Sequence, residues 1–551
     1  MFNSSYEYIS KNEVLSVLLR NRGVLGDDDI DKFLKPNYER DLHDPYLYKD
    51  MDVAVNRIAE AVKKNEQIIV YGDYDCDGIP GSVVLHDFFT KIGYEHFEVY
   101  IPHRHKEGYG LNREAIERFA LNGVSLLITV DSGITDCAEV ARANELDIDV
   151  IITDHHLPGA TLPPAIAVLN AKRIDNTYPD PWLCGAGVAF KLVQALIRHP
   201  DFSVPKGWEK WLMDVVGIAT IADMVPLRGE NRALAHFGLR ALRQTRRPGI
   251  LTLLRKLRIH PNTIAEDTIG FDIGPRINVA SRLDVPLRAF ELLSTIDYEQ
   301  AGSLVGYLEE LNENRKRMVR TALVDAEKFS NTDDAVIVVG SLAWPVGIVG
   351  LVAGRLVERF DKPVFAWGGG GEGCVVRGSC RSDGRVSIVE LMETVAPSIF
   401  EGYGGHEAAG GFSIEEKNIE GLGEELSRAY ARISKNDKKS NQAFCVDGEL
   451  SLDDVDDALV GIIDQCAPYG QENPRPYFLF KNVPIVEASQ FGKAVTHLKI
   501  KTRSAGKPIE CVKFFEDTIP VGPTVTFIGT PERSFFAGRN VIRIRIHSLA
   551  S

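Results

Sequence analysis

Three aspartates at alternate positions form the densest group of reactive side chains in this 551-residue chain. Asp73, Asp75 and Asp77 lie in GDYDCDG, where an apolar run gives way to a glycine-rich turn. Alternate side chains of a strand share one face, so at least two of these carboxylates can converge on one point. A surface turn or a calcium-binding loop would use the same residues, and this segment alone leaves those alternatives open.

Three further segments carry acids or imidazoles at or near the end of an apolar run. Asp131 ends ITVD, and TDHH places Asp154, His155 and His156 together. Asp223 is a lone acid within GIATIADMVPL, and a lone buried acid is costly unless it is paired or binds a metal ion. Taken singly, the histidines could be satisfied in a core, and Asp223 could be a helix cap or half of a structural ion pair.

Carboxylates and imidazoles without thiolates are ligands that suit manganese, magnesium or zinc. A cluster of several acids and a histidine fits two metal ions, which together activate a water and stabilise both oxygens of a phosphoryl displacement. Competing motifs are missing from the sequence, since the glycine-rich GGGGEGCVVRG lacks the lysine of a phosphate-binding loop. These residues therefore predict a metal-dependent phosphoesterase.

Short apolar runs must position these side chains. QIIVYGD, FEVYIPH, SLLITVD and DVIITDHH are typical of strands, and amphipathic stretches separate them. Strands that alternate with helices predict a parallel α/β sheet, and such a sheet binds its ligands at the carboxyl ends of its strands. Asp73, Asp131 and Asp154 each fall at that end.

The remaining pattern predicts an α/β protein with two α/β lobes joined by a long helix, followed by a small C-terminal β-barrel. A polar stretch, ISKNDKKSNQ, is a candidate linker, and short alternating segments such as THLKIKT and VIRIRIH after it favour a barrel of the OB type. The expected units are an N-terminal helical segment (1–50), a catalytic domain (51–286), a connecting helix (287–329), a second α/β lobe (330–434) and the OB-like domain (443–551).

Composition narrows the function classes. The net charge of −14 argues against a protein that coats nucleic acid by electrostatics alone. Two basic clusters, Arg243 to Arg258 and Asn314 to Arg320, could contact phosphates or form solvated helix faces. No apolar run reaches the roughly 18 residues of a membrane span, and the start does not resemble a signal peptide. Eight scattered cysteines without a CxxC pair predict a reducing cytoplasm.

In this order, DYDCDG, VDSG, DHH and the acid of IADMVPL resemble the four motifs of the DHH phosphoesterase superfamily. GYGGHEAAGGF resembles the glycine–histidine motif of its second lobe, called DHHA1. Other segments, among them HRHKEGYGL, CGAGVAFKL and PRINVASRLD, are similar to the branch that degrades single-stranded DNA. The resemblance covers nearly the whole chain and implies a single-strand-specific exonuclease of 5′→3′ polarity that acts in DNA repair and recombination.

The resemblance also implies roles for the residues that match. The metal ligands, for two Mn²⁺ or Mg²⁺ ions, would be Asp75, Asp77, Asp131, His155 and Asp223, with Asp73 a weaker candidate. Asp154 would orient the histidines, and His156 would lie beside the scissile phosphate. The substrate-binding residues would be Arg104, Tyr109, Arg276, Ser379, Arg381 and His406.

Two alternatives remain beside this function. A DHH-type phosphodiesterase that acts on short oligonucleotides or cyclic dinucleotides would share the chemistry but would not need a C-terminal barrel. A non-catalytic scaffold of the same fold would have lost metal ligands, and here every expected ligand is present. We therefore expect single-stranded DNA as the main partner, a single-strand-binding protein or a helicase as further partners, and a cytoplasmic monomer without a membrane attachment.

Overall fold

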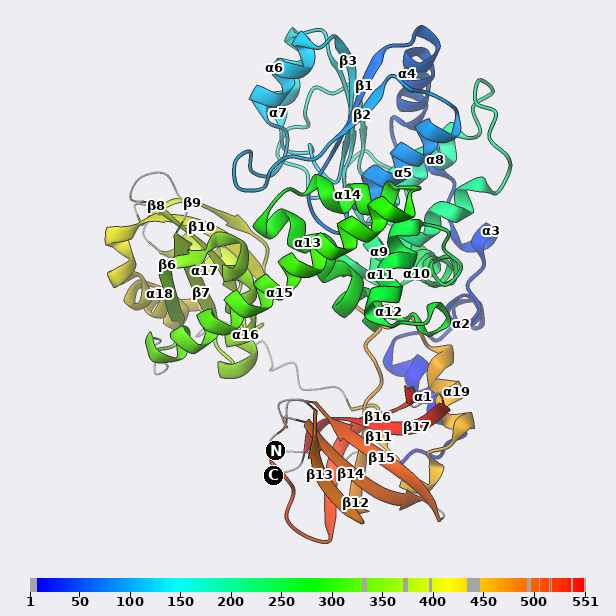
Figure 1. Cartoon of the computed structure of the whole chain (residues 1–551), viewed down its shortest axis with the longest axis vertical. Coiled ribbons are helices and arrows are strands. Elements are labelled where there is room, and N and C mark those ends of the chain that lie inside the picture. Colours follow the sequence, from blue (N-terminus) through cyan, green and yellow to red (C-terminus); the bar gives the residue numbers. More distant parts are fainter. Residues whose placement is uncertain are drawn as a thin grey trace.

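The protein consists of two α/β lobes and a C-terminal β domain, joined in part by one long helix (Figure 1). This computed structural model describes residues 7–329, 334–369, 375–395, 399–433, 446–492, 497–504, 506–514, 516, 518–536 and 539–549. Apart from Ile433, the candidate linker ISKNDKKSNQ lies outside these residues. Within them, none of the helices combines the length and apolar content needed to cross a bilayer.

The first lobe is built on a parallel five-stranded sheet of order β2-β1-β3-β4-β5. Its strands are β1 (Gln67–Gly72), β2 (Phe97–Tyr100), β3 (Val124–Val130), β4 (Asp149–Thr153) and β5 (Ala167–Leu169). Ile68 and Val70 face one apolar core, while Ile69 and Tyr71 face another. Burial on both faces explains why these strands are continuous apolar runs.

Helices cover both faces of this sheet. One face packs against α4 (Met51–Lys64), α5 (Gly78–Lys91) and α8 (Gly185–Leu196), and the other against α6 (Arg113–Leu121) and α7 (Cys137–Glu145). The lobe is completed by α9 (Met213–Ala222), α10 (Gly229–Leu242), α11 (Pro248–Leu257) and α13 (Gly274–Leu283).

The prediction of one connecting helix over residues 287–329 is wrong in one respect. The structure has two helices there, α14 (Leu287–Ser294) and α15 (Tyr298–Phe329). Asp297 causes the break, because its carboxylate accepts hydrogen bonds from the N–H groups of Glu299 (2.6 Å) and Gln300 (3.0 Å) and so begins a new helix. The longer helix, α15, runs from the first lobe to the second (Figure 1).

The second lobe has a mixed five-stranded sheet of order β6-β7-β8-β10-β9. Its strands are β6 (Ile337–Pro345), β7 (Val364–Gly369), β8 (Val375–Arg381), β9 (Phe400–Gly405) and β10 (Ala409–Glu415). Helix α16 (Val346–Phe360) and part of α15 share a core on one face, and α17 (Ile388–Thr394) and α18 (Ile419–Ile433) share a core on the other. The expected α/β character of this lobe is confirmed.

The C-terminal domain has one seven-stranded sheet of order β11-β12-β16-β17-β15-β14-β13 and the helix α19 (Asp457–Gln465). The strands are β11 (Gly448–Glu449), β12 (Phe478–Pro484), β13 (Glu487–Phe491), β14 (His497–Ser504), β15 (Lys507–Lys513), β16 (Thr524–Phe536) and β17 (Arg539–Leu549). Leu498 and Ile500 alternate with half-buried lysines, which gives the period of two that predicted the strand.

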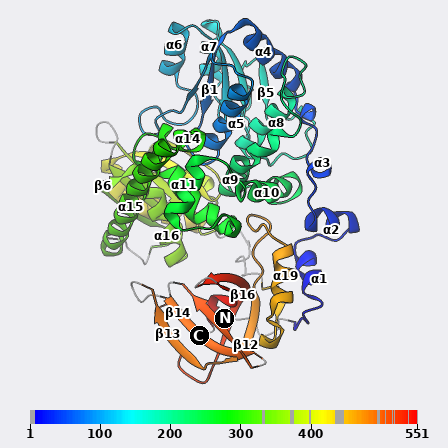
Figure 2. The ribbon, with the colours of Figure 1, turned by 45° about the vertical axis from the view of Figure 1, so that its right-hand side comes forward.

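The N-terminal helices pack against this C-terminal domain rather than against the sheet that follows them in sequence. Val14 and Leu18 of α1 (Val14–Asn21) and Phe33 of α2 (Asp27–Leu34) share a core with Leu459 and Phe480. From there the chain runs along one side of the molecule through α3 (Tyr38–Asp41) to the first lobe (Figure 2). The two ends of the sequence therefore form one folded unit.

A buried arginine joins this unit to the first lobe, and a second one stabilises the unit internally. Arg232 of α10 donates to the carbonyl oxygens of Phe33 (2.7 Å) and Ala467 (2.9 Å). Within the unit itself, Arg22, which follows α1, donates to Asn473 Oδ1 (2.8 Å) and so ties the N-terminal helices to the C-terminal domain. Because buried donors that lose their acceptors are costly, these contacts fix the position of the C-terminal domain.

Candidate metal centre

The carboxyl ends of three neighbouring strands bring the predicted acids together. The N–H group of Asp73 donates to Val130 (3.1 Å), that of Asp131 donates to Thr153 (2.9 Å), and that of Asp154 continues the ladder to β5 (3.1 Å). Each acid therefore stands one step beyond the last residue of its strand, at the edge where a parallel sheet binds its ligands. This placement follows from the sequence, in which each acid ends an apolar run.

The N-terminus of helix α8 contacts two acids of the site, Asp77 and Asp131. The N–H groups of Gly185 and Ala186 donate to the two carboxylate oxygens of Asp77 (2.6 and 2.7 Å). Asp131 has a positive φ of 61°, and a Cβ on Gly185 would lie 2.5 Å from the Cβ of Asp131. Only glycine allows this approach, so the GAG that begins α8 is a part of the site that we had not predicted from chemistry.

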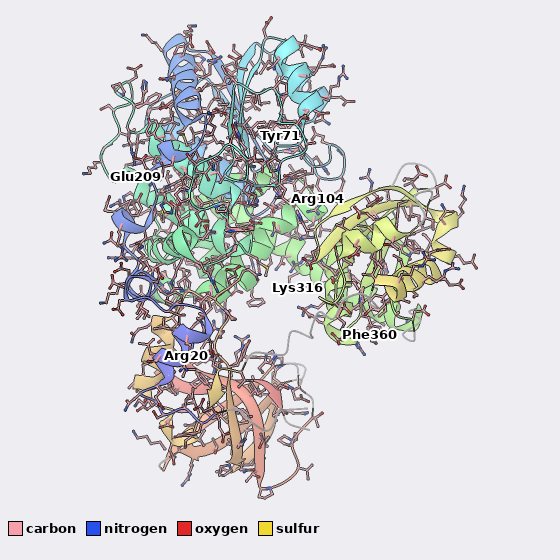
Figure 3. All side chains as sticks on the ribbon, turned by 180° about the vertical axis from the view of Figure 1, so that it is seen from behind. Arg20, Tyr71, Arg104, Glu209, Lys316 and Phe360 are labelled. Carbon is pink, nitrogen blue, oxygen red and sulfur yellow. The ribbon has the colours of Figure 1, made fainter. Side chains whose placement is uncertain are left out.

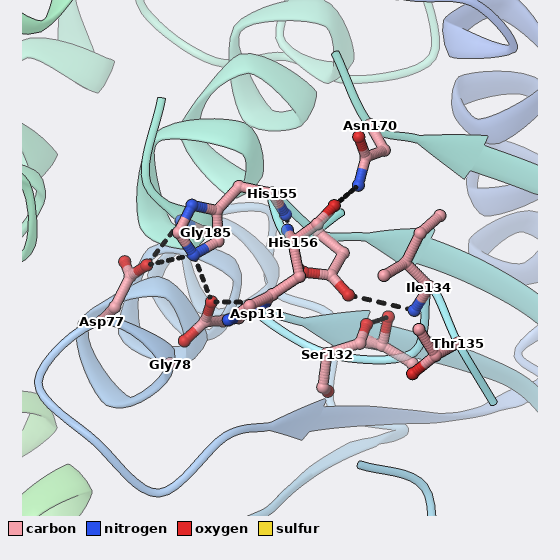
Figure 4. A network of polar contacts seen from close by, with 12 residues as sticks. Asp77, Gly78, Asp131, Ser132, Ile134, Thr135, His155, His156, Asn170 and Gly185 are labelled. Atoms are coloured by element: carbon pink, nitrogen blue, oxygen red, sulfur yellow. Dashed lines mark hydrogen bonds and ion pairs between the residues drawn. The ribbon is translucent and has the colours of Figure 1, made fainter. Parts of the chain in front are cut away.

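His155 lies among three carboxylates. Its Nε2 atom is 3.1 Å from Asp131 Oδ1 and 3.7 Å from Asp77 Oδ2 (Figure 4). The same atom is 3.7 Å from Asp223 Oδ2. Burial lowers the pKa of His155 to about 3, and the charges of His156, Lys172 and His406 act in the same direction. A neutral imidazole nitrogen among acids is the form that binds a metal ion.

The carboxylates themselves carry more negative charge than the neighbouring cations, Arg104 and Lys172, compensate. Burial and the neighbouring acids raise the pKa of Asp77 to about 6 and that of Asp223 to about 9. Burial and nearby carboxylates also raise the pKa values of Asp73 and Asp131 well above the usual range. Oδ1 of each of the latter two is buried and accepts no hydrogen bond from the described residues. Divalent cations would remove this repulsion, so the donor set fits them.

Three groups of ligand atoms lie within 4.8 Å of one another. The groups are Asp77 with His155 and Asp223, Asp73 with Asp75 and Asp131, and Asp131 with His155 and His156. Asp131 belongs to two groups, and His155 links the remaining one to it. This arrangement suits two ions that share Asp131, with oxygen and imidazole ligands of the kind that Mn²⁺ and Mg²⁺ accept.

Asp154 holds the turn that carries both histidines. Its Oδ1 accepts from the N–H groups of His155 (2.7 Å) and His156 (3.0 Å), and its Oδ2 accepts from the N–H of Ile134 (3.0 Å). His156 Nδ1 lies 2.8 Å from the same Oδ1 atom. Although burial opposes it, this contact raises the pKa of His156. The structure thus places Asp154 behind the histidines, as an outer partner that orients them.

Tyr109 also contacts this turn. Its hydroxyl donates to the carbonyl oxygen of Asp131 (3.0 Å) and lies 3.0 Å from His156 Nδ1. The ring remains about half exposed, so Tyr109 lies at the mouth of the site.

Arginines from both lobes meet on one side of the cluster. Arg104 lies where the first lobe approaches the second (Figure 3). Burial lowers the pKa of Arg282 to about 9, and the positive charges of Arg104, Arg315 and Arg381 lower it further. We call these four residues the arginine cluster, in which Asp73 attracts Arg104 and Asp75 attracts Arg282. Arg282 was not named among the predicted site residues, although it lies in the segment PRINVASRLD that carried the resemblance, and Arg315 belongs to the basic cluster Asn314 to Arg320.

Arg276, which was predicted to hold a phosphate, occupies a different environment. Its side chain is buried, forms an ion pair with Glu309 of α15 and donates to the carbonyl oxygen of Asp272 (2.7 Å). The structure therefore ties Arg276 to α15, whereas Arg282 interacts with Arg104 and Arg381. One basic cluster of the sequence is also partly structural, because Arg247 forms buried ion pairs with Asp87 and Asp214.

Ser379, Arg381 and His406 reach the site from the second lobe. Arg381 donates to Ser379 Oγ (2.9 Å) at the end of β8, and His406 lies in the turn between β9 and β10. A Cβ on Gly347 of α16 would lie 2.0 Å from the carbonyl oxygen of Arg282. The lobes therefore touch at this point, with metal ligands on one side and Arg381 and His406 on the other.

A parallel sheet that carries such a carboxylate–histidine cluster defines a metal-dependent phosphoesterase. Three family models match the chain: "DHH family, N-terminal domain" at residues 67–220, "DHHA1 domain" at residues 333–432 and "RecJ OB domain" at residues 446–548. They correspond to the first lobe, the second lobe and the C-terminal domain.

Curated relatives match over most of the chain. The single-stranded-DNA-specific exonuclease RecJ of Salmonella typhimurium is 34% identical over 78% of this chain and 77% of its own length. RecJ of Bacillus subtilis is 33% identical over 95% of this chain, which spans 66% of that relative. The crystal structure of Thermus thermophilus RecJ with Mn²⁺ matches with a TM-score of 0.82 and 27% identity, over 99% of this chain and 79% of that one. The same Thermus protein has also been solved with Mg²⁺. The chain belongs to the RecJ family of single-stranded-DNA-specific exonucleases.

Proposed function

We propose that this protein removes nucleotides from the 5′ end of single-stranded DNA with the help of two divalent metal ions. Family membership supports a metal-dependent exonuclease that is specific for single strands. The observation that carries the proposal is the position of His155, whose neutral Nε2 lies 3.1–3.7 Å from three carboxylates. This arrangement is unfavourable for a structural core and favourable for a metal centre.

The residues of the cluster have separate roles in this proposal. The cations would be held by Asp73, Asp75, Asp77, Asp131, His155 and Asp223. When bound, two such ions lower the pKa of a water molecule and neutralise charge on the attacking and leaving oxygens. His156 is held by Asp154, which favours its protonated form, so its free ring nitrogen can donate to an oxygen of the scissile phosphate. Tyr109 keeps that imidazole in position.

The arginine cluster provides the basis for polarity. The arginine cluster adjoins the metal centre through Arg104 and Arg282, which Asp73 and Asp75 attract, and Arg104 and Arg381 come from opposite lobes. A terminal 5′-phosphate carries more negative charge than an internal phosphodiester, and guanidinium groups bind it with paired donors. We assign the terminal phosphate to Arg104, Arg282, Arg381 and Ser379, which would leave the first phosphodiester over the metal ions.

The selection of single strands follows from contacts that both lobes make with the strand end. A strand end at the metals would be contacted by the first lobe and by Arg381 and His406 of the second. Opening a duplex costs roughly 1.4 kcal/mol per base-pair step. The sequence contains no phosphate-binding loop of a nucleotide-driven motor, so binding alone must supply that free energy. We propose that a helicase or a single-strand-binding protein delivers the single strands.

The C-terminal domain supports a polymeric substrate rather than a short one. It matches the RecJ OB domain, and OB folds bind single strands through stacking and phosphate contacts. A hydrolase of short oligonucleotides or cyclic dinucleotides is therefore not favoured. We further propose a monomer that works in the reducing cytoplasm, a proposal supported by six described cysteines that are all free.

Digestion of one oligonucleotide labelled at either end tests the proposal. With a 5′ label, the first product should be a labelled mononucleotide. With a 3′ label, a ladder of shortening strands should appear. Release of labelled mononucleotide from the 3′ end first would reverse the polarity, and internal fragments from both labels would identify an endonuclease instead.

A further inference from the structure

Lys172 is a half-buried lysine beside the metal centre that forms no salt bridge with any described residue. Burial lowers its pKa, against the attraction of the carboxylates of Asp223, Asp154 and Asp131. Its charge in turn contributes to the low pKa of His155. A half-buried ammonium that forms no direct ion pair can bind an anionic ligand, which makes Lys172 a candidate for such a contact.

Asn170 fixes the position of Lys172 relative to the histidines. Asn170 is fully buried, its amide group donates to the carbonyl oxygen of His156 (2.9 Å), and its Oδ1 accepts from the N–H of Lys172 (2.8 Å). Figure 4 shows the first of these contacts, which ties the end of β5 to the DHH turn. Lys172 is therefore held in register with the metal centre rather than placed on a mobile surface.

Trp182 stands next to Lys172 and is unusually exposed for its size. Its side chain is 54% exposed, and Lys172 Nζ lies 5.4 Å from the centre of its ring system. The backbone of Trp182 is fixed, because its carbonyl accepts from Asn231 Nδ2 (2.7 Å) and its N–H donates to Asp180 Oδ1 (3.0 Å). Trp182 lies three residues before Gly185, whose N–H donates a hydrogen bond to Asp77.

The metal centre thus has two cationic sides. The arginine cluster is near Asp73 and Asp75, whereas Lys172 is near Asp154 and Asp223. On the proposed path, a strand whose terminal phosphate lies in the arginine cluster and whose scissile phosphate lies at the metal centre continues toward Asp154 and Asp223, the acids that attract Lys172. Lys172 and Trp182 stand there, with a phosphate-binding cation and an exposed aromatic face.

We propose that Lys172 and Trp182 form a nucleotide subsite on the 3′ side of the scissile bond. The ammonium of Lys172 binds the phosphate that follows the scissile one, and the indole of Trp182 stacks on the base of that nucleotide. The inference rests on the proposed function, since it takes its direction from the terminal phosphate in the arginine cluster. Stacking is independent of base identity and needs an unpaired base, so the subsite also favours single strands.

Binding to 5′-phosphorylated oligo(dT) in EDTA tests the subsite without cleavage. DNA should quench tryptophan fluorescence in the wild type, and Trp182→Leu should lose most of this quenching and bind about tenfold more weakly, within the range for one stacked base. Trp182→Phe should restore most of the affinity. The matched control is Trp211→Leu, because Trp211 is also exposed and contacts a cation, Arg246, at 4.1 Å.

Salt dependence tests Lys172 separately. Lys172→Gln should reduce the slope of log affinity against log salt by about 0.7, the contribution of one phosphate contact on a single strand. Arg246→Gln is its control and should leave the slope unchanged. With Mn²⁺, both subsite variants should raise KM for a dodecamer more than they lower kcat.

Two different outcomes separate a wrong function from a wrong subsite. If the wild type does not degrade single strands, the proposed function is wrong. If it does, two results would refute the subsite. One is that DNA quenches the fluorescence of Trp182→Leu and Trp211→Leu equally and binds both with equal affinity. The other is that the salt dependence of DNA affinity is the same for Lys172→Gln and the wild type. Circular dichroism melting of each variant separates loss of binding from loss of fold, and Trp182→Phe gives a second folded test.

Discussion

Asp131 Oδ1 lies 3.1 Å from Nε2 of His155, although the imidazole carries no positive charge. The two side chains come from the ends of neighbouring strands, β3 and β4, whose register is set by Val130 and Thr153. Such an approach is not an ion pair, because burial holds the histidine neutral. It is the arrangement expected of two ligands whose cation completes the site, and the first three predictions depend on it.

Asp131→Asn should abolish turnover while keeping the fold. The amide preserves the volume of the side chain but removes its negative charge, and Asp131 belongs to two of the groups of ligand atoms. We therefore expect kcat/KM to fall by more than the roughly 10- to 100-fold caused by loss of a residue that only orients a metal ligand. Steady-state digestion of a short oligonucleotide in Mn²⁺ measures this. Asp149→Asn is the control, since Asp149 begins the same β4 strand and pairs with Arg57 at the far end of the sheet. Near-normal turnover of a folded Asp131→Asn variant would remove Asp131 from the centre.

Asp223→Asn should stabilise the metal-free protein. The pKa of Asp223 is raised to about 9 by burial and by Asp77 and Asp75, from an ordinary value near 4 in the unfolded chain. A carboxyl with a raised folded-state pKa loses stability as pH rises, here between about 4 and 9. In EDTA, the melting temperature of the wild type should therefore fall from pH 6 to pH 9, and the variant should fall less.

Manganese should reverse this difference. Mn²⁺ should raise the melting temperature of the wild type, because an ion that binds only the folded state stabilises that state. The melting temperature of Asp223→Asn should rise less. Differential scanning fluorimetry at pH 8 measures both effects. An equal gain in the two proteins would show that Asp223 is not a ligand.

Much of the site could be predicted because each acid ends an apolar strand, and parallel strands bring their carboxyl ends to one edge. The arginines were harder to predict. Arg276 and Arg282 lie six residues apart in one helix, and only the packing of α13 against α15 directs the first to Glu309 and leaves the second near Arg381. The break at Asp297 was visible in the sequence as a capping residue, but the charge-rich pattern around it favoured one helix.

The packing partner of the N-terminal segment could not be predicted from the sequence. Its helices were predictable from apolar spacing, but their partner was not, because Leu18 packs against residues more than 400 positions away. Contacts at such separation leave no local pattern. They also affect experimental design, since truncation after Asn441 would expose the apolar face of α1 and so confound loss of DNA binding with loss of fold.

Arg381→Gln should weaken the preference for a phosphorylated 5′ end. Wild-type protein should digest 5′-phosphorylated strands faster than 5′-hydroxyl strands, and the variant should lose most of this ratio, by about tenfold if one charged contact contributes roughly 1.5 kcal/mol. Its melting-temperature gain with Mn²⁺ should stay normal. Arg428→Gln, an exposed arginine on α18 in the same lobe, is the control. An unchanged ratio in Arg381→Gln would place the terminal phosphate elsewhere.

Leu18→Ala should destabilise the C-terminal domain. Leu18 is fully buried between α1 and that domain, and removal of such a side chain costs about 2–5 kcal/mol. Urea unfolding followed by proteolysis of the C-terminal domain measures the change. Leu25→Ala is the control, because Leu25 is 70% exposed. If the two variants unfold alike, the N-terminal helices do not belong to that unit.

The most direct test of the central claim is digestion of a 5′-phosphorylated single strand and of the same sequence as a blunt duplex, each with Mn²⁺ or EDTA. We predict rapid release of mononucleotides from the single strand with Mn²⁺, none with EDTA, and little from the duplex. Undiminished digestion in EDTA would contradict a metal centre built on Asp131 and His155, and efficient digestion of the blunt duplex would contradict selection by the two lobes.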